Sequence, residues 1–159
     1  MIILGIDIGH KNFAMSILQN INNKIDIICV KKEIIKISYN ILNKIYNDYK
    51  LYLSKYVLIE EQFKGKKNIY YMGFITSFFQ SKNINVIIVK PYTYGMNITT
   101  YAHRKKMTID ILNTLINKCD NTSINKINKF DDVADATCLI LKWMKININV
   151  MHINSIQII

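Results

Sequence analysis

Carboxylates stand at the ends of three apolar segments that lie far apart in the chain. The acids are Asp7 in ILGIDIG, Glu60 and Glu61 in VLIEEQF, and Asp131, Asp132 and Asp135 in DDVADA. A carboxylate beside apolar residues is costly to desolvate unless a positive charge lies against it. Converging carboxylates, together with water and phosphate oxygens, are the ligands that Mg²⁺ prefers. The pattern therefore predicts a magnesium site that acts on a phosphodiester.

The spacing of the last acids is compatible with two interpretations. Asp132 and Asp135 are three residues apart, so they share one face of a helix. Acids in a first helical turn also stabilise the helix dipole, and an isolated pair would fit an ordinary helix start capped by Asp131. The metal interpretation gains from the combination with Asp7 and Glu60. Four such side chains suffice to hold two Mg²⁺ ions roughly 3.5–4 Å apart for in-line hydrolysis.

The strand-end acids have their own alternatives. Asp7 in a strand could simply accept a hydrogen bond near a turn, but Gly5 and Gly9 flank it, and strand glycines mark a close approach of backbone or ligand. Glu60 and Glu61 point to opposite faces of a strand, so only one of them can reach a shared site. The strand pattern alone does not choose between them.

Composition indicates one folded domain spanning residues 1–159 with a polyanionic partner. Half of the residues are hydrophobic, mean hydropathy is +0.11, and 21 Lys and Arg against 11 Asp and Glu give a net charge of +10. Nucleic acid is the expected partner, although overuse of Lys, Asn and Ile in the coding sequence would produce a similar excess. The three cysteines form no CxxC pair, so neither zinc nor a disulfide framework is predicted. We expect no membrane span and no signal peptide.

Hydrophobic periodicity predicts a mixed α/β fold. Strands are expected at residues 2–9, 13–18, 25–30, 56–61 and 86–89, and helices at 38–53, 70–80, 104–118 and 131–144. The first three strands form an antiparallel meander, and the last two are parallel because a helix connects them. A basic loop is expected at 63–68 and a second loop at 92–101, while the tail at 147–159 has no assignable pattern. In this five-stranded sheet flanked by helices, the first and fourth strands can be neighbours, which brings Asp7 and Glu60 together.

The three acidic motifs, in this order and spacing, resemble those of the RuvC-like Holliday junction resolvases of the ribonuclease H-like superfamily, and most of all their poxvirus members. The resemblance implies a metal-dependent homodimer that resolves four-way DNA junctions by paired symmetric nicks, during processing of recombined or concatemeric viral DNA in the host cytoplasm. It implies two Mg²⁺ per site, with Mn²⁺ as a substitute. The implied metal ligands and catalytic acids are Asp7, Glu60, Asp132 and Asp135. A catalytic lysine falls on Lys105 or Lys106, and Lys105 is preferred.

The resemblance also implies a DNA-contacting segment. An aromatic residue three positions after the glutamate corresponds to Phe63, for which a place in the core is an equally good alternative. Basic residues around the two segments would contact phosphates: Lys64, Lys66, Lys67, Arg104 and Lys106.

Other functions are compatible with the same pattern. The helix at 70–80 is apolar nearly all round, so we expect part of it to form a twofold dimer interface. A ribonuclease H-like nuclease with another nucleic-acid substrate and a non-catalytic basic binding module are the alternatives. A sugar-kinase or actin-like ATPase ranks last, because the chain is too short for a second domain.

Overall fold

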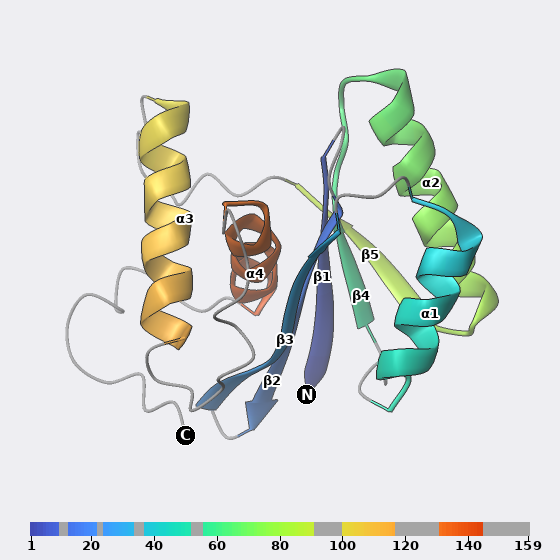
Figure 1. Cartoon of the computed structure of the whole chain (residues 1–159), viewed down its shortest axis with the longest axis horizontal. Helices are drawn as coiled ribbons and strands as arrows, with labels where there is room; N and C mark the ends of the chain where they lie inside the picture. Colours follow the sequence, from blue (N-terminus) through green and yellow to red (C-terminus); the bar gives the residue numbers. More distant parts are fainter. Residues whose placement is uncertain are drawn as a thin grey trace.

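The computed structural model describes residues 1–9, 13–21, 24–33, 37–51, 56–90, 100–116 and 131–144. Within these residues, strands form one five-stranded mixed sheet in the order β3-β2-β1-β4-β5 (Figure 1). The strands are β1 (Ile2–Ile8), β2 (Phe13–Ile21), β3 (Lys24–Glu33), β4 (Tyr56–Glu60) and β5 (Asn85–Val89). The expected fold class is thereby confirmed.

The sheet joins a meander to a parallel pair, as the sequence predicts. β1, β2 and β3 are antiparallel neighbours, and β4 runs parallel to both β1 and β5. Ile6 pairs with Ile59, so the next residues along the two strands, Asp7 and Glu60, lie at the same edge of the sheet.

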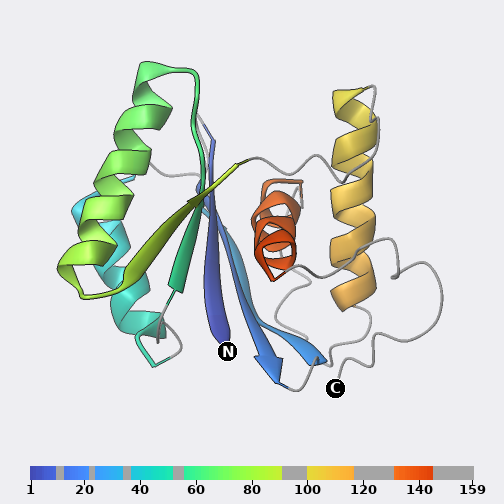
Figure 2. The same ribbon diagram turned by 180° about the vertical axis from the view of Figure 1, so that it is seen from behind.

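Helices cover both faces of the sheet. They are α1 (Tyr39–Tyr49), α2 (Lys66–Ser81), α3 (Tyr101–Ile116) and α4 (Asp131–Trp143). Figures 1 and 2 show α1 and α2 on one face, and α4 on the other with α3 packed outside it. None of the helices in the described residues is long and apolar enough to cross a membrane.

The two faces of the sheet belong to two separate hydrophobic clusters, and strand alternation assigns the acids to one of them. Ile3 and Leu58 pack in the cluster with α3 and α4, whereas Ile6 and Ile59 pack in the cluster with α1 and α2. Because successive side chains alternate between the faces of a strand, Asp7 and Glu60 both belong to the α4 face. Glu61, one residue further, does not.

A glycine lets α4 approach this face closely. A Cβ atom on Gly5 would lie 2.5 Å from the carbonyl oxygen of Ala136 and 2.7 Å from Ile140 Cγ1. Glycine is therefore required where β1 and α4 touch, as the sequence indicates for a strand glycine beside Asp7. A buried hydrogen bond of 2.9 Å from Thr137 Oγ1 to Ser16 Oγ fixes the same helix over β2.

Element boundaries differ from the predicted ones mainly at helix starts. α2 begins at Lys66, so the second half of the predicted 63–68 loop is wrong; Gly65, with φ of 82°, turns the chain into the helix. α3 begins at Tyr101, where the Thr100 hydroxyl accepts a hydrogen bond from the His103 N–H. The predicted cap Ser38 is confirmed, since its Oγ accepts from the Ile41 N–H. The loop at 92–101, except for its last two residues, and the tail lie outside the described residues.

Candidate active site

Two carboxylates form the strand half of the site, at the ends of β1 and β4. Asp7 is only 9% exposed, and a side-chain hydrogen bond joins it to Glu60. Burial raises the pKa of Asp7 well above its usual value, and the negative charges of Glu60 and Asp135 raise it further. Burial also raises the pKa of Glu60, although the hydrogen bond from Asp7 opposes this. The pair therefore binds protons more tightly than ordinary carboxylates do.

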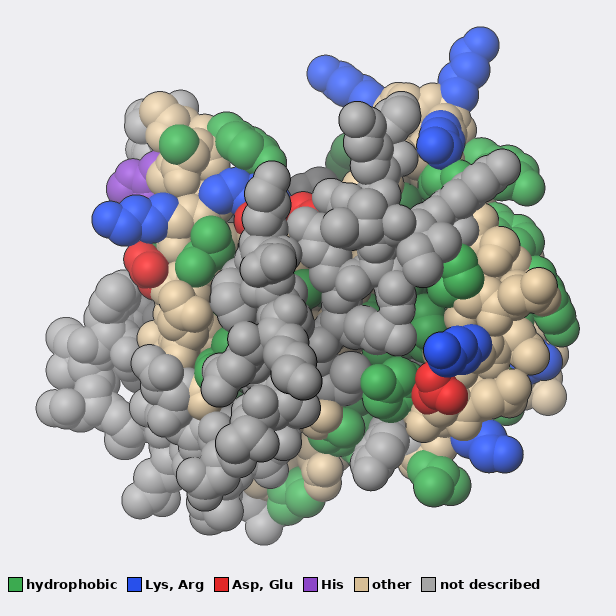
Figure 3. Space-filling view, viewed as in Figure 1, with side chains coloured by type: hydrophobic (Ala, Val, Ile, Leu, Met, Phe, Trp, Pro, Cys, Tyr) green, Lys and Arg blue, Asp and Glu red, His purple; other side chains and the backbone are tan. Residues whose placement is uncertain are grey.

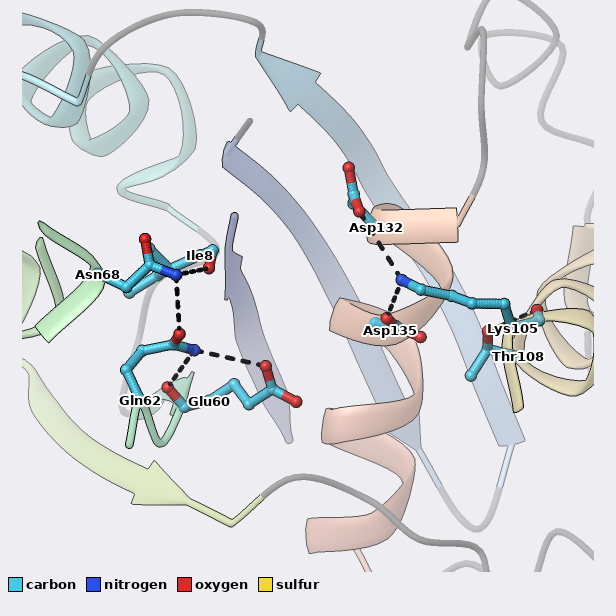
Figure 4. Close-up of polar contacts among 8 residues, drawn as sticks. All are labelled: Ile8, Glu60, Gln62, Asn68, Lys105, Thr108, Asp132 and Asp135. Carbon is cyan, nitrogen blue, oxygen red and sulfur yellow. Dashed lines mark hydrogen bonds and ion pairs between the residues drawn. The ribbon is translucent and has the colours of Figure 1, made fainter. Parts of the chain in front are cut away.

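The helix half of the site is organised by a lysine (Figure 4). Lys105, the fifth residue of α3, donates a hydrogen bond to Asp135 Oδ2, and its Nζ lies 3.8 Å from Asp132 Oδ1. These three side chains are 14–17% exposed. Burial alone would lower the pKa of Lys105, but its bond to Asp135 raises it overall. The lysine thus remains charged and neutralises both helix acids.

The two halves face each other across the seam between β1 and α4. The charge of Asp135 raises the pKa of both Asp7 and Glu60, which places all three within electrostatic reach. In the described part of the chain, no three acidic, imidazole or thiol side chains are arranged as a ready-made metal cluster. Like charges repel one another, and Lys105 lies against the helix acids. The oxygen donors suit a hard cation, and Lys105 contacts only one oxygen of each helix carboxylate.

The geometry decides which member of two adjacent pairs, Glu60–Glu61 and Lys105–Lys106, reaches the site, a choice that the sequence leaves open. Glu61 continues the strand pairing through its N–H, 2.8 Å from the Val89 carbonyl oxygen, whereas Glu60 contacts Asp7. Lys106 is exposed and Lys105 contacts the acids. Glu60 and Lys105 are therefore the members that the fold brings into the site.

The predicted DNA-contacting residues line one end of the molecule. Phe63 is 61% exposed, so the alternative that places it in the core is wrong. Lys64, Lys66 and Lys67 are also exposed at the start of α2, and Lys67 Nζ lies 5.6 Å from the centre of the Tyr71 ring. Figure 3 shows Lys and Arg side chains gathered at the end of the molecule where α2 and α3 begin, with carboxylates visible between them.

Arg104, predicted as a DNA contact, also lies close enough to the acids to act on them. Its guanidinium carbon is 5.3 Å from the centre of the Tyr101 ring, and its positive charge lowers the pKa of Glu60. The side chain is half-buried. Arg104 and Lys105 therefore place two adjacent cations beside the site from one helical turn.

Sequence reasoning missed two amide side chains, one that contacts Glu60 and one that contacts the first amide. Gln62 donates to the Glu60 carbonyl oxygen and carboxylate, and Asn68 donates to Gln62. Gln62 follows Glu60 by two residues, which returns an extended chain to the same face, and this is a usable signal. No such signal exists for Asn68, because its contact is made only when α2 packs beside the ends of the strands.

Comparisons with known proteins agree with this architecture. The family described as Poxvirus A22 protein matches residues 1–149. A Holliday junction resolvase of fowlpox virus (strain NVSL) is 33% identical over 150 residues, which are 91% of this chain and 93% of that protein. The crystal structure of fowlpox virus resolvase with its substrate Holliday junction DNA has a TM-score of 0.70 at 31% identity, covering 91% of this chain and 97% of that one. Thermus thermophilus RuvC, at 15% identity and a TM-score of 0.59 over 91% of this chain and 97% of its own, shares the fold.

Proposed function

The chain belongs to the poxvirus A22 protein family, and we propose that it resolves four-way DNA junctions as a nuclease that makes paired, symmetric nicks. The observation that carries this proposal is the convergence of strand acids and helix acids at one end of the sheet, with Lys105 between the helix acids. Burying this many acids costs desolvation free energy. A cationic cofactor and a phosphate substrate explain that cost better than a role in stabilising the fold does. The named activity of the fowlpox relative supports the same substrate.

We assign metal binding to Asp7, Glu60, Asp132 and Asp135. Their oxygen donors suit Mg²⁺, and Mn²⁺ accepts the same ligands. When bound, two such ions would neutralise the phosphate charge and activate water for attack on phosphorus. Hydrolysis breaks the bond to the 3′ oxygen, leaving a 3′-hydroxyl and a 5′-phosphate.

The basic side chains have separate tasks in this proposal. Lys105 stabilises the negative charge that develops on the phosphate. Arg104 and Lys106 bind flanking phosphates, and the exposed Lys64, Lys66 and Lys67 bind a junction arm. Phe63, exposed beside them, stacks on bases at the branch point.

Symmetric cutting requires two sites related by a twofold axis, so we propose a homodimer. α2 contributes Ile75 and Phe79 to the core but leaves Tyr70 66% and Ile69 45% exposed. The ring of Tyr70 stacks on that of Phe74, at 6.2 Å between centres. This outer face of α2 is the proposed interface. A monomer at micromolar concentration in size exclusion with light scattering would contradict it.

The deciding experiment is cleavage of an end-labelled four-way DNA junction with Mg²⁺ or with EDTA. We expect paired symmetric nicks from the wild type, none with EDTA, and none from Asp132→Asn. The matched control is Asp48→Asn, an exposed acid of α1 on the opposite side of the sheet. An RNA–DNA hybrid tests the alternative nuclease. Binding without cleavage under every divalent metal would indicate a non-catalytic module.

A further inference from the structure

Two amide side chains connect the end of β1 to Glu60 (Figure 4). Gln62 Nε2 lies 3.2 Å from the Glu60 carbonyl oxygen and 3.4 Å from Glu60 Oε2, and donates to both. Asn68 Nδ2 donates to Gln62 Oε1 at 3.2 Å and to the Ile8 carbonyl oxygen at 3.4 Å. The resulting chain links both strand ends of the site to the first turn of α2.

Asn68 fixes the direction of these hydrogen bonds. A primary amide offers a donor and an acceptor of nearly equal size, so Gln62 could face Glu60 with its NH₂ group or with its oxygen. The Ile8 carbonyl only accepts, so Asn68 keeps its NH₂ group on that side and presents a donor to Gln62. Gln62 must therefore turn its oxygen to Asn68 and its NH₂ group to the Glu60 carboxylate.

This arrangement selects one oxygen of Glu60. Oε2 accepts from Gln62, which limits rotation of the carboxylate beside Asp7, the other hydrogen-bond partner of Glu60. A reversed Gln62 would place two oxygens face to face. Hydrogen-bonded neighbours of this kind orient metal ligands, and their loss typically costs about 10–100-fold in metal affinity or activity.

We propose that Gln62 and Asn68 are positioning residues of the metal site: Gln62 orients the Glu60 carboxylate, and Asn68 orients Gln62. Neither residue contacts the reacting atoms. The inference rests on the proposed function because it assumes that Glu60 binds a divalent metal. It goes beyond that function because it proposes that Asn68, in the first turn of α2, determines through Gln62 how the Glu60 carboxylate is oriented.

The test is Mn²⁺ binding to the DNA-free protein, measured by electron paramagnetic resonance, for Gln62→Met and Asn68→Leu. Both substitutions keep the side-chain volume and remove the hydrogen bonds. We expect the Kd for Mn²⁺ to rise about tenfold or more for each. The double variant should be no weaker than Gln62→Met alone, because the two residues act in series.

Matched controls are Gln80→Met, exposed on α2, and Asn113→Leu, exposed on α3. They remove the same chemical groups and should bind Mn²⁺ as the wild type does. Junction affinity in EDTA should change less than about twofold in all four variants, because no phosphate-binding cation is removed. Circular dichroism checks folding, and Gln62→Ala or Asn68→Ala replaces any variant that unfolds.

The outcomes separate the two proposals. Wild-type Mn²⁺ affinity in folded Gln62→Met and Asn68→Leu would overturn the positioning role, and so would a wild type that binds no Mn²⁺. Weakened Mn²⁺ binding in these variants, with a wild type that cuts no junction, would support the positioning role and contradict the proposed function. A melting temperature that falls while Mn²⁺ affinity stays the same would indicate a purely structural role and overturn the inference.

Discussion

At the scale of single residues, ionising the buried carboxylates of the site costs free energy. Burial and neighbouring acids raise the pKa of Asp7, and burial raises that of Glu60, so both bind protons more tightly in the folded chain than in the unfolded one. Stability from such groups is fully present below the ordinary carboxyl pKa and is lost as the pH rises through the folded value. At neutral pH the metal-free protein is therefore expected to be less stable than it would be if Asp7 and Glu60 carried no charge.

Asp7→Asn should raise the Tm of the metal-free protein at pH 7 and flatten its dependence on pH above about pH 4. The amide keeps the shape and removes the buried charge; each 1 kcal/mol corresponds to roughly 2–4 °C in a protein of this size. Differential scanning fluorimetry in EDTA from pH 4 to 8 measures this. The same variant should abolish cleavage. An unchanged pH profile would show that Asp7 carries no unfavourable charge.

Lys105→Met should have two effects, because Lys105 pairs with both Asp132 and Asp135. Without metal, the unpaired acids should lower the free energy of unfolding by about 1–3 kcal/mol. Cleavage at saturating Mg²⁺ should fall by about 10²–10³, the cost of losing one charge-stabilising donor. Mg²⁺ should restore more stability to this variant than to the wild type. Lys44→Met, exposed on α1, is the control, and full activity in Lys105→Met would remove the lysine from the mechanism.

Elements position the acids through one close contact, between Gly5 of β1 and Ala136 of α4. The strand acids and the helix acids belong to these two layers, so their separation depends on how closely the layers approach. A methyl group at residue 5 would meet a backbone oxygen, which cannot rotate away. A small change at the seam is therefore expected to alter catalysis more than binding.

Gly5→Ala should shift α4, lower stability by about 1–3 kcal/mol, and reduce cleavage while leaving junction binding in EDTA near the wild-type value. Gly73→Ala is the control for stability alone, because a Cβ there meets nothing within 4 Å but lies on the proposed dimer face of α2; in a helix it should stabilise by up to about 1 kcal/mol. Thermal melts, filter binding and single-turnover cleavage measure the three quantities. Normal cleavage by a folded Gly5→Ala would show that the seam tolerates expansion.

Much of this element arrangement was predictable because it depends on local patterns. Apolar runs indicate the strands, and the helix between the last two strands requires them to be parallel. The pattern lacks information about tertiary packing. Glu60 can be chosen over Glu61 only when it is known on which face of the sheet α4 packs. The start of α2 at Lys66 was missed because Gly65, which has no side-chain cap, provides the turn by its positive φ. The contact of Asn68 with Gln62 depends on two elements meeting, so no spacing predicts it.

The whole molecule carries a net charge of +10 while concentrating acids in its site. Exposed cations at the starts of α2 and α3 lie on two sides of those acids (Figure 3). A polyanion would thus be attracted by the exposed cations, and a divalent cation would relieve the repulsion that remains among the acids. Binding and cutting should accordingly depend on different ions, monovalent salt for the first and divalent metal for the second.

Replacing Lys64, Lys66 and Lys67 with Gln should weaken junction binding and make it less sensitive to salt. Removing one lysine that binds a phosphate is expected to lower the slope of log K against log salt by about 1. Fluorescence anisotropy from about 50 to about 200 mM NaCl, over which binding through phosphate contacts weakens steeply, measures it. Lys44→Gln is the single-site control. An unchanged slope would place the DNA elsewhere on the surface.

The division of the carboxylates between two strands, β1 and β4, and the last helix, α4, also bears on the synthesis of the protein. A ribosome adding roughly 5–20 residues per second releases the strand acids seconds before the helix acids. During that interval the nascent chain holds only the strand half of the candidate site. The site is complete only when α4 docks on the sheet, so a chain that stops before residue 131 would lack Asp132 and Asp135.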